Sequence, residues 1–150
     1  MTSTDLSAPT EDELDMLVSI AIRRAELLAE IKSPMSAGAW REVMAYEEYL
    51  ARITQPAEIA GGVARAGAVT AALAAGQRLD AQRLASQYLA EDALPAERRL
   101  MIERAITQDA KRLAEHFPAL TKQGRLRWIA ELDSWRSSVL ANPHVFPCPA

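Results

Sequence analysis

One stretch, residues 56–76, constrains the fold more than any other part of the sequence. It reads PAEIAGGVARAGAVTAALAAG and contains only two charged residues, Glu58 and Arg65. Small residues recur at four-residue intervals along it, so neighbouring helices can approach closely on several sides. A helix without a clear polar face belongs in the middle of a bundle. The sequence therefore predicts a central Ala/Gly-rich helix with other helices packed around it.

The same stretch is close to the length that spans a bilayer. Alanine and glycine contribute little to membrane insertion, and Arg65 near the middle would cost roughly 2.5 kcal/mol or more. We therefore interpret the stretch as the core of a soluble bundle and expect no membrane association.

Length and composition point to one all-α domain. A chain of 150 residues can bury a single core without a staple, and its low aromatic content of 5% favours helices over strands. We predict a single-domain bundle or helical-hairpin array of about five to six antiparallel helices around the central helix. It should cover residues 11–141, between a disordered segment at 1–10 and an extended proline-rich tail at 142–150.

Capping and breaking residues predict where the helices begin and end. Thr10 and Glu13 have the spacing of a capping box, Asp80 is the expected N-cap of a short helix, and Gly76 has the place of a left-handed C-cap. The expected helices cover residues 11–32, 37–53, 56–76, 81–91, 95–116 and 122–140.

Residues 73–91 resemble the turn of a tetratricopeptide-type hairpin, because Gly76 closes one helix and Ala81 follows five positions later. Val69 and Ala72 replace the residues that this repeat expects in its first helix. No second copy appears at a fixed period, so a generic helical hairpin explains the segment better.

The first helix carries two apolar stripes. One of them suits packing inside the bundle, and the other is a candidate interaction surface formed by Met16, Ile20, Leu27 and Ile31. Two stripes predict two packing partners, one of which could be another molecule. The second helix is apolar on one face, and its other face carries Arg41, Glu42, Glu47, Glu48 and Arg52.

The sixth helix offers a candidate nucleic-acid surface formed by Lys122, Arg125, Arg127 and Arg136. Trp128 and Trp135 share an apolar stripe with Leu132, which assigns them to the core rather than to stacking on bases. The net charge of -3 is small, so nothing in the overall balance favours nucleic acid.

Catalytic and metal-binding patterns are missing from the sequence. His116 lacks a glutamate at the spacing that di-iron bundles use. His144 lies four residues from the single cysteine, Cys148, but both stand in the proline-rich tail, where proximity alone is a weak sign of a nucleophile. We expect no enzyme activity, no metal and no cofactor.

These observations favour a cytoplasmic, non-catalytic protein-protein interaction module: an adaptor, an accessory subunit or a self-assembling component. A single cysteine and a polar, acidic N-terminus agree with a reducing compartment. A nucleic-acid-associated regulatory protein that uses the fifth and sixth helices is the alternative. A bundle that encloses a small hydrophobic ligand is a third hypothesis, although no polar anchor for a ligand is visible in the sequence.

Overall fold

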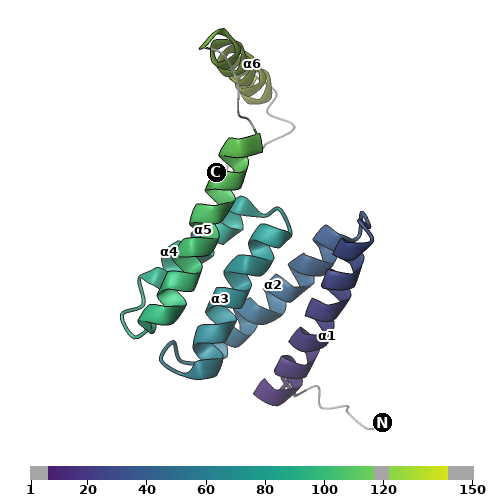
Figure 1. Ribbon diagram of the computed structural model, residues 1–150, viewed down its shortest axis with the longest axis vertical. Coiled ribbons are helices and arrows are strands. Elements are labelled where there is room, and N and C mark those ends of the chain that lie inside the picture. The colour runs from purple at the N-terminus through teal and green to yellow at the C-terminus, as the bar shows by residue number, and fades with distance from the viewer. Residues whose placement is uncertain (1–6, 117–121, 142–150) are drawn as a thin grey trace. The chain divides into compact units, whose positions relative to one another are not determined.

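The computed structural model describes residues 7–116 and 122–141, and these ranges contain helices and no strand (Figure 1). The helices are α1 (Glu11–Glu30), α2 (Ser36–Ile53), α3 (Ile59–Ala74), α4 (Arg78–Leu89), α5 (Ala96–His116) and α6 (Lys122–Leu140). The all-α prediction is confirmed. The chain divides into two compact units, residues 1–111 and 112–150, with the boundary inside α5. The predicted domain bounds, with a disordered start and an extended tail, stay a prediction.

Two of the predicted caps are present. The Thr10 hydroxyl accepts from the Glu13 amide at 3.2 Å, and the Glu13 carboxylate accepts from the Thr10 amide at 3.1 Å, which completes the capping box of α1. Gly76 has φ +73°, and the amide of Gln77 donates to the carbonyl of Ala72 at 2.8 Å. Gly76 therefore terminates α3 in the left-handed conformation, as predicted.

Three predicted boundaries were wrong. α1 stops at Glu30, because the chain turns through a left-handed residue, Lys32, at φ +53°. α3 begins at Ile59, three residues after Pro56, which lies in a turn. α4 begins at Arg78, so Asp80 lies in the first turn of this helix rather than at its N-cap. There the negative charge of Asp80 interacts favourably with the positive end of the helix dipole.

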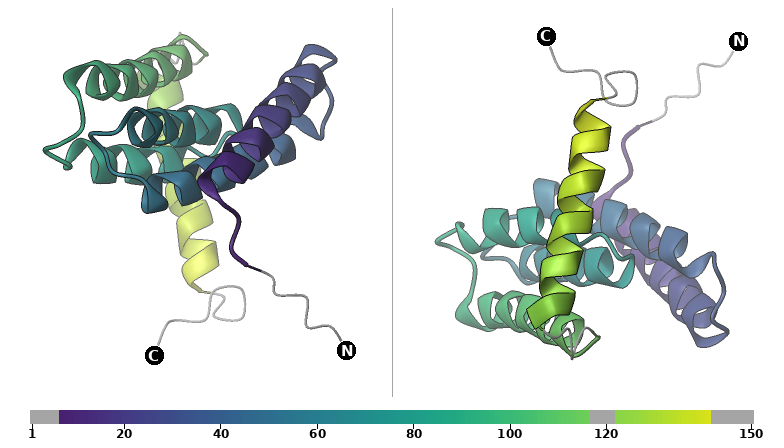
Figure 2. Two further views of the ribbon diagram at one scale, coloured as in Figure 1. Left: turned by 90° about the horizontal axis from the view of Figure 1, so that it is seen from below. Right: turned by 90° about the horizontal axis from the view of Figure 1, so that it is seen from above.

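Unit 1 is built from helical hairpins. Consecutive helices from α1 to α4 run alternately up and down, and α1 lies at one edge of the unit (Figures 1 and 2). Nine of the sixteen residues of α3 are buried, and both hydrophobic clusters of the unit include residues of this helix. α3 also meets α5, because Arg98 lies over Gly62, where an added Cβ would be 2.9 Å from the Arg98 side chain.

Small side chains set how the core is packed. Ala68 and Ala72 are completely buried in a cluster with Leu84 of α4 and Ile102 of α5, while Ala71 belongs to a second cluster with α1 and α2. Alanine leaves only a methyl group between helix axes, so the neighbouring helices approach α3 closely and supply the larger side chains.

Candidate functional site

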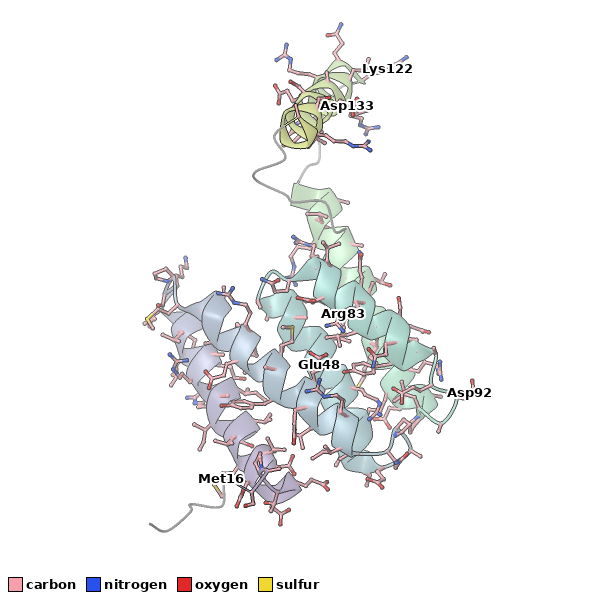
Figure 3. The ribbon with its side chains drawn as sticks, turned by 180° about the vertical axis from the view of Figure 1, so that it is seen from behind. Met16, Glu48, Arg83, Asp92, Lys122 and Asp133 are labelled. Carbon is pink, nitrogen blue, oxygen red and sulfur yellow. The ribbon has the colours of Figure 1, made fainter. Side chains whose placement is uncertain are left out.

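The predicted apolar stripe on the first helix is exposed. Met16, Ile20, Leu27 and Ile31, which we call the α1 surface, are between 45% and 73% exposed. Met16 points away from the neighbouring helices (Figure 3). The opposite side of α1 is buried, and it carries Leu14, Val18, Ala21 and Ala25. The two stripes therefore have the separate environments that two packing partners require, one of them inside unit 1.

The α1 surface is hollowed between Ile20 and Leu27. A shallow apolar groove of about 560 Å³ lies there, flanked by Arg23 and Arg24. Each arginine is engaged at its own side: Arg23 pairs with Glu26 at 3.5 Å, and Arg24 pairs with Glu42 of α2 at 3.4 Å. These exposed ion pairs contribute little stability, but they hold charged groups beside the groove.

The four basic residues predicted on the sixth helix do not form one patch. All four are exposed on α6, but helical geometry separates them. Lys122, Arg125 and Arg136 fall on one side, and Arg127 falls on the opposite side. Asp133 lies on the side with three bases, so the charge there is partly offset. The arrangement gives little support to a phosphate-binding surface.

On α6 taken by itself, Trp128 is 46% exposed and Leu132 is 52% exposed. The assignment of Trp128 to a core stays a prediction. The side chains of Trp135 and His116, together with His144 and Cys148, lie outside the described residues.

Glu47 is the functional candidate that the sequence analysis missed. We expected it on the charged face of the second helix, but it is only 5% exposed and faces α1 and α3. A Cβ added at Gly67 of α3 would lie 2.7 Å from its carboxyl carbon, so the carboxylate occupies the space that a larger residue would fill. Burial first, and then the negative charge of Asp15, raise the pKa of Glu47 to about 7. The neighbouring Glu48 points elsewhere and pairs with Arg83 of α4 at 3.6 Å (Figure 3).

Arg65, the lone base inside the Ala/Gly helix, is buried and fully engaged. Its guanidinium holds the carboxylate of Glu91 through two bonds of 2.8 and 3.0 Å. It also donates to the carbonyls of Gly61 at 3.0 Å and Thr54 at 3.3 Å. The Tyr88 ring lies 5.6 Å below the guanidinium carbon, close enough for a cation–π contact. The planar guanidinium of Arg65 can make these bonds together, and they join three segments of the chain. We therefore assign Arg65 a structural role.

The phenol of Tyr88, like the carboxyl of Glu47, is buried away from water. Burial, followed by the charge of Glu48, raises the pKa of Tyr88 to about 12, although the guanidinium of Arg65 opposes this shift. Arg99 of α5 closes the region by donating to the backbone carbonyls of Leu89 and Glu91 at the end of α4.

Within residues 7–116 and 122–141, no three His, Cys, Asp or Glu side chains gather in a way that could hold a metal ion. In the same part of the chain, no helix is both long and apolar enough to cross a bilayer.

No protein-family model matches the chain, and neither a curated protein nor a solved structure is similar to it at a significant level. The functional argument therefore depends on the geometry of the α1 surface and of the Glu47 side chain.

Proposed function

We propose that this protein is a non-catalytic module that works through protein contacts, and that the α1 surface pairs with the same surface of a second copy. The observation that carries the proposal is the exposure of four large apolar side chains in one line along a helix whose opposite side is buried. Apolar residues grouped on one side of a helix mark an interaction site more often than scattered apolar residues do. Here Arg23 and Arg24 lie between the Met16–Ile20 pair and the Leu27–Ile31 pair.

The spacing of the α1 surface supports a second copy as its occupant. Met16 and Ile31 lie at equal distances along the sequence from the point between Arg23 and Arg24, and so do Ile20 and Leu27. An antiparallel pair of α1 helices related by a two-fold axis would therefore place each apolar residue opposite an apolar residue of the other copy.

The energy of this contact favours a reversible dimer. Full burial of a side chain of this size stabilises by about 1.5–3 kcal/mol, so the partly exposed residues of two copies together contribute on the order of 10 kcal/mol. Association costs about 4–15 kcal/mol in lost freedom of motion. We therefore expect dissociation in the micromolar to millimolar range rather than a permanent dimer.

Sedimentation equilibrium tests the proposal. Between about 10 and 500 μM, the mass should rise from the 16.4 kDa monomer toward twice that value. The double variant Ile20→Glu with Leu27→Glu should stay monomeric while circular dichroism shows an unchanged helix content. Leu79→Glu is the matched control, because Leu79 is an 84% exposed apolar residue of α4 away from the α1 surface.

Two outcomes would refute this function. A mass that stays at the monomer value up to about 500 μM would exclude self-pairing at the strength that the buried area supports. A control variant that dissociates the protein as fully as the double variant would place the contact outside the α1 surface.

A further inference from the structure

A second groove lies on unit 1, on another side of α1 from Ile20 and Leu27, and Ser19 borders both grooves. It has a volume of about 570 Å³ and is formed by α1, α2 and α3. We call it the Glu47 groove, and its lining consists of Asp15, Val18, Ser19, Ile22, Glu47, Leu50, Ile59, Ala60, Val63 and Ala64. The volume is in the range of small-molecule sites, and the lining is apolar apart from three side chains, which is the usual composition of such a site.

Glu47 gives this groove a polar anchor. Glu47 is only 5% exposed, and no described residue forms a hydrogen bond or an ion pair with its carboxylate. Among the described residues no completely buried side-chain oxygen lacks a hydrogen-bond partner, so the Glu47 carboxylate oxygens reach the surface of the groove. A ligand that enters the groove can therefore reach these oxygens directly. The exposed fraction rises from Glu47 to 84% at Ile59, so the groove opens to solvent at the α3 end.

The charges around Glu47 favour a cationic partner. Asp15 of α1 adds negative charge, and α3 lines the groove with no charged side chain. Arg65, the base of α3, is committed to Glu91. Ser19 donates its hydroxyl proton to the Asp15 carbonyl at 2.9 Å, so its oxygen keeps lone pairs that can accept a bond. The polar atoms of the groove are therefore acceptors, and an ammonium group supplies only donors.

We propose that the Glu47 groove binds a primary alkylammonium ion, with the ammonium on the Glu47 carboxylate and the hydrocarbon chain along Leu50, Val63 and Ile59. Asp15 and the Ser19 hydroxyl stand at the α1 side of the groove, where they can accept the remaining ammonium protons. The apolar lining selects an aliphatic chain over a compact hydrated cation, because the chain gains by leaving water while the charge is paired.

Three ligands of equal chain length separate the charge from the hydrocarbon: octylammonium, octanol and octanoate. Titration calorimetry at pH 7 should show octylammonium binding at least about 10-fold more tightly than octanol, as a charge-assisted hydrogen bond requires, and octanoate binding most weakly. Bound octylammonium should also shift the amide signals of Val63 and Ala64 in NMR spectra. These signals identify the groove independently of any variant.

Glu47→Gln keeps the side-chain shape and removes the charge, so it should reduce the octylammonium affinity to that of octanol. Glu48→Gln is the matched control, because the adjacent carboxylate pairs with Arg83 and is outside the groove, and it should leave the affinity unchanged. Equal affinities for octylammonium and octanol, unchanged octylammonium binding in Glu47→Gln, or signal shifts away from Val63 and Ala64 would each overturn the proposal. If Glu47→Gln does not fold, the comparison of the three ligands and the NMR map still decide it. The dimer measurement on the α1 surface is independent of this result.

Discussion

Replacing Glu47 with glutamine should change how the stability of the protein depends on pH. The buried carboxyl has a folded-state pKa of about 7, against an ordinary value of 4.5. Between these two values the folded protein holds a proton that the unfolded chain has released. The free energy of unfolding contributed by this group is therefore fully present below pH 4.5 and is lost as the pH rises through 7.

The size of the effect follows from the shift in pKa. Each unit corresponds to about 1.4 kcal/mol, so the wild-type protein should lose on the order of 3 kcal/mol from this group between pH 4.5 and about 7. Glutamine cannot ionise, so the variant lacks this loss. The free energies of unfolding of the two proteins should differ least at pH 4.5. The difference should then increase with pH in favour of the variant until it becomes constant above about pH 7.

Urea unfolding of both proteins at intervals between pH 4.5 and 8 measures the difference directly. All other titrating groups are shared, so they cancel when the two free energies of unfolding are subtracted. An NMR titration of the Glu47 carboxyl carbon gives the midpoint independently. A difference that is flat over this interval, or a midpoint near 4.5, would show that the carboxylate is solvated rather than buried, and the reasoning about its environment would fail.

Three further predictions concern the core and its caps, all measured by urea or thermal unfolding. Arg65→Met should lower the free energy of unfolding by about 3 kcal/mol, because it leaves a carboxylate and two carbonyls without their donor. Arg65→Lys should recover only part of this loss. Full recovery by lysine would contradict a role for the planar guanidinium. Ala68→Leu should overpack the core and cost about 1–3 kcal/mol, whereas Ala74→Leu at the exposed end of α3 should be nearly neutral. A neutral Ala68→Leu would contradict the burial of this residue. Gly76→Ala should cost about 1–2 kcal/mol, because the backbone there has φ +73°. Gly38→Ala should stabilise by up to about 1 kcal/mol, because Gly38 has an ordinary helical position and an added Cβ would be 3.7 Å from its nearest neighbour. A neutral Gly76→Ala would argue against the left-handed cap.

Local signals in the sequence predicted the elements and one of the two candidate sites. The Thr10 capping box and the Gly76 cap depend on residues at most five positions apart, so they could be identified without the fold. The α1 surface was equally accessible, because the positions of Met16 and Ile31 on a helix follow from its periodicity alone.

Glu47 and Arg65 required the tertiary structure. Periodicity assigns Glu47 to a charged face, but it cannot show that α1 and α3 cover part of that face. The available signal was Gly67, because a glycine inside a helix often marks a close approach by another segment. Arg65 stood out as a lone charge among small residues, yet its partner Glu91 is 26 positions away in the sequence, beyond the range of any helical spacing.

The guanidinium of Arg65 joins two connections of the chain that are far apart in sequence. It donates to Thr54, at the start of the α2–α3 connection, and to Glu91, in the α4–α5 connection. If either connection opens, the same group loses part of its coordination, so the free energies of the two openings are coupled. In native-state hydrogen exchange, backbone amides on both sides should then behave as one cooperative unit, although the rest of the hairpin array is organised by contacts between neighbours in sequence. A molecule that tightens one connection would thereby slow exchange in the other, with no change in the position of either.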